Sequence, residues 1–87
     1  MARTLDELKA DLAAKIRELR IARGVTQEQL ALQADVDRTY VSQVERSVGN
    51  PSLLVLAKLA EVFEVDVAVL LEPGAARKDV RRVRRES

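Results

Sequence analysis

The stretch TQEQLALQADVDRTYVSQVER, residues 26–46, is the most informative part of this chain. It holds two short segments with the spacing of helices, separated by a few residues that suit a tight turn. Two helices joined in this way form a helix-turn-helix, whose second helix can lie in the major groove of DNA. Small and apolar residues occupy the positions that such a unit buries: Leu30, Ala31, Ala34, Val36, Val41 and Val44.

Helix signals continue on both sides of this unit. Leucine and isoleucine at three- and four-residue steps predict a long amphipathic helix over residues 5–23, and Gly24 suits its C-terminal end. A residue that can cap a helix N-terminus precedes each expected helix: Thr4, Thr26, Asp37, Ser52 and Asp66. The valine-rich residues 62–71 would also suit a strand, but a lone strand would lack a partner. We therefore expect an all-α bundle of five helices, at about residues 5–23, 27–33, 38–46, 53–63 and 67–71.

The composition narrows the classes of protein that the chain can form. Its 87 residues suffice for one small domain, which we place at residues 1–73. The chain has neither cysteine nor histidine, which excludes disulfides and thiolate metal sites and removes the commonest general base. We expect no catalytic residue, no metal and no cofactor, and therefore a protein that is not an enzyme.

The chain carries no signal for a membrane. No apolar run approaches the roughly 20 residues that span a bilayer. The N-terminal sequence MARTLDELKADL has acidic residues and periodic leucines, unlike a signal peptide. We expect a soluble, cytoplasmic protein without a membrane partner.

Charge is unevenly distributed along the chain. Residues 1–73 hold nine Lys/Arg and twelve Asp/Glu, a balance of −3, whereas residues 74–87 hold six Lys/Arg and two Asp/Glu, a balance of +4. This basic tail suits a solvated extension, an arm that binds phosphates, or an extra helix that docks on a partner subunit through Val80 and Val83. A nucleic-acid surface on the rest of the chain must come from local clustering of charge.

Polar side chains of the second helix of the unit are candidates for contact with double-stranded DNA. Arg38 and Thr39 lie in its leading turn, where an arginine can bind guanine bidentately and a threonine can meet a thymine methyl group. Ser42 and Gln43 follow one turn later and can reach base edges or phosphates. Tyr40 can donate to a phosphate through its hydroxyl, or its ring can pack beneath the turn.

Residues outside this helix are candidates for the DNA backbone. Gln27 opens the preceding helix, whose exposed N–H groups attract anions. Arg46 ends the second helix and Asn50 lies beyond it, and both are candidates for contact with the DNA backbone. Arg17 and Arg23 are expected to be solvated or to lie against phosphates.

Two further groups of residues are expected to be structural. Arg20 and Glu45 each lie beside apolar positions, and we predict that they form an ion pair. The C-terminal apolar residues exceed what a short last helix can bury, and an exposed apolar patch of this kind indicates an interface. The predicted homodimer interface comprises Val65, Val67, Val69, Leu70 and Leu71.

Over residues 12–72, from LAAKIRELRIARGVTQEQLA to NPSLLVLAKLAEVFEVDVAVLLE, the chain resembles the lambda-repressor-like family of Cro/C1-type (XRE) helix-turn-helix proteins. The stretch DRTYVSQVER at 37–46 is particularly similar to restriction–modification controller proteins, small homodimers that regulate their own operon. The resemblance implies a five-helix bundle, contact of Gln27 with phosphate, base recognition by Arg38 and Thr39, the Arg20–Glu45 pair, and dimerisation around residues 65–71.

The chain departs from the family pattern at three places. Asp35 and Glu64 stand where glycine is usual, although aspartate tolerates a left-handed conformation better than most residues. The loop Ser47-Val48-Gly49 lacks the basic residue that family members often carry there, which weakens the usual contact with phosphate.

These features predict a sequence-specific transcription regulator that binds a palindrome-like operator as a homodimer. Repression would follow from covering a promoter, whereas activation would need RNA polymerase as a partner, for which Glu28 is the candidate contact. The alternative is an antitoxin-type protein-interaction module with secondary DNA binding. Val80 and Val83 offer fewer apolar anchors than a segment that wraps a toxin usually carries.

Overall fold

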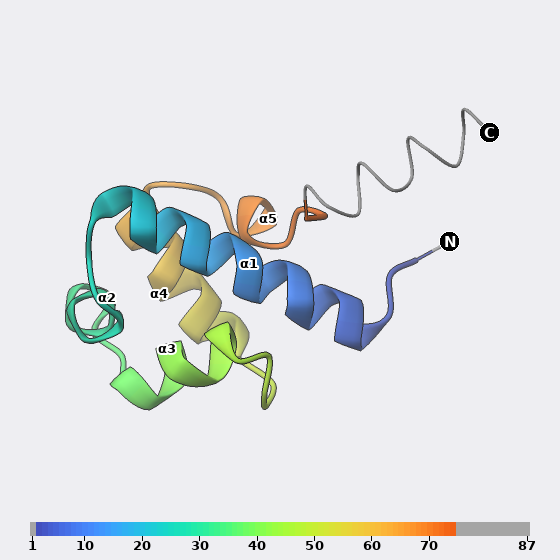
Figure 1. The fold of residues 1–87 in the computed structure, drawn as a ribbon, viewed down its shortest axis with the longest axis horizontal. Coiled ribbons are helices and arrows are strands. Elements are labelled where there is room, and N and C mark those ends of the chain that lie inside the picture. The colour runs from blue at the N-terminus through green and yellow to red at the C-terminus, as the bar shows by residue number, and fades with distance from the viewer. Residues whose placement is uncertain (1, 75–87) are drawn as a thin grey trace.

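The computed structural model describes residues 2–74, so the tail beyond Gly74 lies outside the described residues. The described part contains helices and no strand, which confirms the all-α prediction (Figure 1). The helices are α1 (Leu5–Arg23), α2 (Gln27–Ala34), α3 (Arg38–Glu45), α4 (Leu53–Phe63) and α5 (Val67–Leu70).

The observed helix ends differ from the expected ones by one residue at three places. Helix α2 includes Ala34, because the left-handed residue follows it, and α3 and α5 each end one residue early. Arg46 and Leu71, expected to be helical, instead have C-cap conformations with ψ near zero. The valine-rich segment resolves into the end of α4, a short turn and α5. None of the helices among residues 2–74 is long and apolar enough to cross a bilayer.

Side chains of the capping residues satisfy the N-terminal N–H groups of each helix. Thr4 and Thr26 form complete capping boxes with Glu7 and Gln29, in which each side chain of the pair accepts from the other residue's backbone N–H. The caps of the remaining helices each accept one N–H in the first turn. They are Asp37, Ser52 and Asp66.

Left-handed residues end α1, α2 and α4 and reverse the chain direction there. They are Gly24 at φ 70°, Asp35 at φ 57° and Glu64 at φ 55°. Lys58 of α4 donates to the backbone oxygen of Asp35 at 3.2 Å, which ties the turn of the helix-turn-helix to α4. The turn therefore forms with aspartate in the place usually held by glycine.

The core lies between the helices, and every helix in Figure 1 contributes buried side chains to it. Helices α2 and α3 pack against each other, α1 packs against α3 and α5, and α4 packs against α2 and α5. The most deeply buried side chains come one from each helix: Ile16, Leu30, Val41, Leu59 and Leu70.

The burial of Leu70 corrects one expectation. Its exposed fraction is 0% in a single chain, so it belongs to the core and not to a dimer interface. Val65, Val67 and Leu71 also pack against this core, although they stay partly exposed. The last helix therefore buries more of its apolar surface within the protomer than the sequence suggested.

Both ends of the described chain meet one buried carboxylate. Asp11 of α1 accepts from the Arg3 guanidinium at 2.6 Å and from the Gly74 backbone N–H at 3.0 Å. A buried charge is costly without partners, and these two contacts supply them. The same contacts hold both ends of the described chain against α1.

Candidate nucleic-acid interface

Helix α3 presents a polar face to solvent because its other face is buried. Val41, Val44 and Glu45 point into the protein, and Asp37 caps the N-terminus by accepting the Thr39 N–H at 2.8 Å. This hydrogen bond lowers the pKa of Asp37, which keeps the cap ionised. Arg38 is exposed in the leading turn. The start of α3 is therefore the part of the helix that is open to a large ligand.

The other expected contact residues lie along the same helix and just beyond it. Ser42 and Gln43 are half-buried, whereas Arg46 and Asn50 are exposed. The Nε of Arg46 donates to the backbone oxygen of Ser42 at 3.4 Å, so this side chain lies back along α3.

Tyr40 is exposed, which excludes one of its two expected roles. Its exposed fraction is 48%, so the ring does not pack beneath the turn. Phe63, the other aromatic residue, is buried in the core. Contact of the Tyr40 hydroxyl with a phosphate stays a prediction.

The expected pair of Arg20 and Glu45 is present and forms the centre of a larger network. The Nε of Arg20 donates to Glu45 Oε2 at 2.6 Å and its Nη2 donates to Oε1 at 3.0 Å. Its Nη1 donates to the backbone oxygen of Val25 at 3.0 Å. Gln27 adds a hydrogen bond from Nε2 to Glu45 Oε1 at 3.2 Å. One carboxylate therefore joins α1, α2 and α3.

The network shifts the pKa values of its members. Burial alone raises the pKa of Glu45, but the hydrogen bonds from Arg20 and Gln27 and the charges of Arg20 and Arg17 lower it below its usual range. The hydrogen bond to Glu45 raises the pKa of Arg20. Both groups therefore stay charged at neutral pH.

The sequence did not predict two of these contacts. Gln27 was expected to face phosphate alone, whereas its amide also binds Glu45. Arg17 donates from Nη2 to the backbone oxygen of Glu45 at 3.2 Å. The one available signal was the spacing of Arg17 and Arg20, which places them one turn apart on α1.

An open depression lined by polar residues brings together residues that were expected to have different roles in DNA binding. Arg38, expected to read bases, lines it together with Gln27, expected to bind phosphate. Arg20, Thr26 and Glu28 complete its wall. The first turns of α2 and α3 therefore face one region of the surface.

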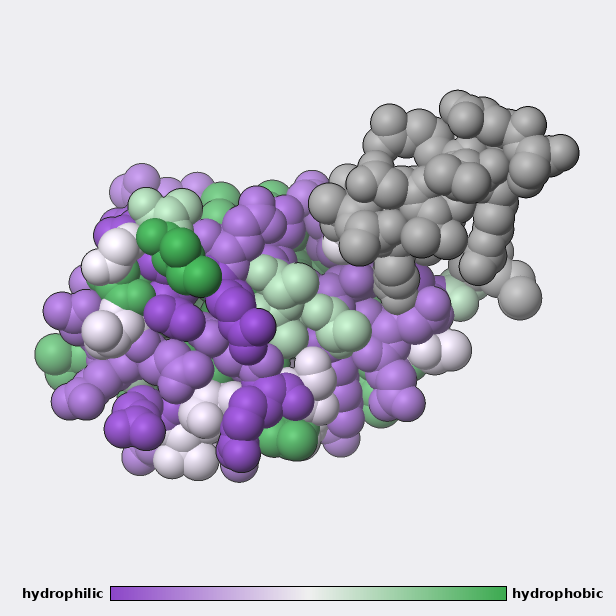
Figure 2. All heavy atoms as spheres, viewed as in Figure 1, coloured by the Kyte–Doolittle hydropathy of each residue, from purple (hydrophilic) through white to green (hydrophobic). Residues whose placement is uncertain are grey.

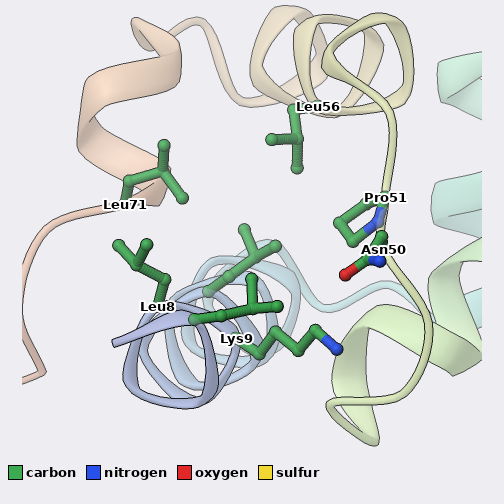
Figure 3. Close-up of a pocket in the computed structure, with 8 residues that line it drawn as sticks. Leu8, Lys9, Asn50, Pro51, Leu56 and Leu71 are labelled. Atoms are coloured by element: carbon green, nitrogen blue, oxygen red, sulfur yellow. The ribbon is translucent and has the colours of Figure 1, made fainter. Parts of the chain in front are cut away.

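A second hollow, about 390 Å³ in volume, lies between the first half of α1 and the segments around α4 and α5 (Figure 3). The labelled side chains Leu8, Leu56 and Leu71 point into it, and Asn50 and Lys9 lie at one side. This pocket was not expected from the sequence. It adjoins the loop after α3 but shares no residue with the polar depression.

The remaining surface is mainly hydrophilic on the face shown in Figure 2, with hydrophobic side chains in small separate groups. Of the expected interface residues, Val69 is half-buried and does not pack against the core cluster, unlike Val65, Val67 and Leu71. Val69 is thus the residue of that set most available to a second chain.

Comparison with known proteins agrees with this arrangement. A family model described as helix-turn-helix (HTH_3) matches residues 16–70. A hypothetical transcription factor from Neisseria meningitidis is 42% identical over 71 residues, which cover 82% of this chain and 67% of that protein. A solved structure of a hypothetical transcription factor from Neisseria superposes with a TM-score of 0.76 at 38% identity, over 92% of each chain.

Restriction–modification controller proteins are also among the relatives. Control protein C.BamHI from Bacillus amyloliquefaciens is 36% identical over 59 residues, or 67% of this chain and 73% of that protein. The crystal structure of the controller protein C.AhdI from Aeromonas hydrophila superposes with a TM-score of 0.67 at 39% identity, covering 71% of this chain and 94% of that one.

The fold and the exposed face of α3 define a DNA-binding transcription regulator of the helix-turn-helix class. The chain belongs to the HTH_3 family of Cro/C1-type helix-turn-helix proteins. These relatives are transcription regulators and not enzymes.

Proposed function

We propose that the protein binds a palindrome-like operator as a homodimer and regulates transcription in a sequence-specific way. Two copies related by a two-fold axis would place their α3 helices about 34 Å apart, one turn of DNA. The observation that carries the proposal is the exposed start of α3, where Arg38 shares a surface depression with Gln27. Residues 1–73 would form the DNA-binding domain and residues 74–87 a basic tail.

In this proposal each contact residue has a defined role. Arg38 and Thr39 contact base edges in the major groove, since they occupy the leading turn of α3. Gln27 and Tyr40 contact phosphates on either side of that turn. The residues further along contact base edges or phosphates: Ser42, Gln43, Arg46 and Asn50.

We further propose that the protein is a controller that regulates its own operon. The similarity to C.BamHI and C.AhdI supports this. The helix-turn-helix family model, which matches residues 16–70, includes the whole of α2 and α3. The relatives do not share one sign of regulation, since they include an immunity repressor of Bacillus phage phi105 and the transcriptional activator BcrR of Enterococcus faecalis.

Activation would require a surface for RNA polymerase near the DNA. Glu28 is exposed in the first turn of α2, and Leu32, one turn later, is 83% exposed. This acidic and apolar face of α2 is the surface we propose for that contact. Replacing Glu28 by alanine should then reduce transcription from the protein's own promoter without weakening operator binding.

The test is selection of binding sites from a random DNA duplex library at near-physiological salt, with the wild-type protein and Arg38→Ala side by side. A two-fold symmetric motif should be enriched by the wild type and blurred at one base pair per half-site by the variant. The variant should lose about 1–3 kcal/mol of binding free energy on the selected site.

Other outcomes would assign the protein differently. An equal loss of affinity on every sequence would make Arg38 a phosphate contact. Absence of any enriched motif would contradict sequence recognition and favour the antitoxin-type alternative, for which a partner protein should then be sought.

A further inference from the structure

We propose that Arg17 is a phosphate-binding residue of the DNA interface, held in position by the C-terminal end of the recognition helix α3. This inference rests on the proposed function. It names a residue of α1 that lies outside the helix-turn-helix itself.

The C-terminal end of α3 orients Arg17 by two contacts. Its Nη2 donates to the backbone oxygen of Glu45 at 3.2 Å, and its Nε lies 3.6 Å from Glu45 Oε1. The Arg17 side chain nevertheless remains 56% exposed. A guanidinium has five N–H donors in a fixed plane, so these contacts orient the group and leave donors that point to solvent.

Arg17 and Gln27 converge on the same oxygen. The Gln27 amide donates to Glu45 Oε1, the atom that also lies beside Arg17 Nε. Gln27 is the first residue of α2, where the N–H groups of the helix N-terminus already favour an anion. An arginine beside that position can bind the same phosphate as Gln27, or it can bind the next phosphate along the DNA strand.

The charge balance and the use of donors distinguish Arg17 from Arg20. Glu45 supplies one negative charge to two guanidinium groups, so the cluster keeps an excess positive charge. Arg20 is 17% exposed and all three of its nitrogens donate to protein oxygens. Arg17 is therefore the guanidinium of the pair that can turn its remaining donors to DNA.

A structural role is the alternative. Arginine near a helix C-terminus can stabilise the last carbonyl groups and the helix dipole without any ligand. The two roles differ in their dependence on salt, since only a phosphate contact releases counterions from DNA when the protein binds.

The experiment measures operator affinity between 50 and 200 mM salt for the wild type, Arg17→Ala and Arg17→Gln. Removing one phosphate contact should reduce the slope of log affinity against log salt by about 0.9, so the wild type's advantage should shrink about threefold over this range. The loss should be equal on operator and random duplexes. Arg17→Gln keeps a side-chain donor for Glu45, so it tests the charge even if Arg17→Ala folds poorly.

The matched control is Lys15→Ala. Lys15 lies on the same helix, and its ammonium group pairs with Glu18 at 3.9 Å and with Glu72 at 3.6 Å. Its removal should leave the slope nearly unchanged. If both Arg17 variants keep the wild-type slope of log affinity against log salt, whatever their melting temperatures, Arg17 does not bind phosphate. That outcome would leave the proposed function standing. Absence of salt-dependent DNA binding by the wild type would instead overturn the proposed function.

Discussion

Glu45 is the residue on which the polar architecture of this protein depends. It lies on the buried side of the recognition helix, with only 1% of its side chain exposed. A buried carboxylate is costly unless charged and polar partners surround it. Arg20 and Gln27 supply these partners from α1 and α2, so Glu45 links α3 to the two helices that we propose to approach the DNA backbone.

Loss of either partner of this pair should strongly destabilise the fold. Glu45→Ala and Arg20→Ala should each lower the free energy of unfolding by about 3–5 kcal/mol, because the remaining charge stays buried without its partner. Urea denaturation followed by circular dichroism measures this change. Arg23→Ala is the control and should change stability little. A loss below about 1 kcal/mol in both variants would show that the pair behaves as a surface ion pair.

The same carboxylate should make stability depend on pH. The pKa of Glu45 is lower in the folded protein than in the unfolded chain, so its contribution is fully present above the ordinary glutamate pKa of about 4.3. That contribution is lost as the pH falls through the lowered folded-state pKa. The stability of the wild type should therefore fall in acid, and its advantage over Glu45→Gln should narrow. If the stability difference between the wild type and Glu45→Gln stays constant from pH 7 into acid, the ionised Glu45 carboxylate is not its source.

At the scale of the helices, residues at the two ends of each helix determine where it begins and ends. Capping side chains begin each helix, and left-handed residues end α1, α2 and α4. Only Gly24 among these three lacks a Cβ atom. Asp35 and Glu64 adopt the same backbone conformation at a steric cost that glycine does not have.

Glycine at these ends should stabilise the protein. Glu64→Gly should raise the free energy of unfolding by about 1 kcal/mol, and Asp35→Gly by less, because aspartate tolerates the left-handed region better. The converse control is Gly24→Ala, which should destabilise, since its φ is 70° although no atom would obstruct a Cβ there. Thermal unfolding of the three variants gives the comparison. A stabilising Gly24→Ala would show that backbone strain does not set these energies.

At the scale of the whole molecule, the C-terminal apolar segment divides between core and surface. Leu70 is fully buried, whereas Val69, its neighbour in α5, is half-buried and outside the core cluster. The two residues therefore separate the stability of the protomer from the proposed dimerisation.

Substitutions at these neighbouring positions should affect different properties of the protein. Leu70→Ala should lower the free energy of unfolding by about 2–5 kcal/mol through the cavity it leaves. Val69→Lys should leave the fold intact and shift the protein from dimer to monomer, because a charge is costly in an apolar interface. Sedimentation equilibrium measures the second effect. A Val69→Lys protein that dimerises as the wild type does would place the interface elsewhere.

Much of this fold follows from short-range patterns in the chain. N-terminal caps act within three residues, and the spacing of apolar residues marks the buried side of each helix, so the helices and the helix-turn-helix are predictable. The exposed turn of α3 is predictable for the same reason, because Asp37 fixes its start and Val41 and Val44 fix its buried side.

Other features depend on how the helices cross. Arg17 and Arg20 are 28 and 25 residues from Glu45 in the chain, and their convergence follows from the position of α1 over α3. Helical spacing likewise places Leu70 on an apolar side without saying whether the protomer or a partner covers it. Local sequence specifies each helix because its hydrogen bonds are local, whereas the tertiary structure decides which surfaces meet, since burial depends on all the helices at once.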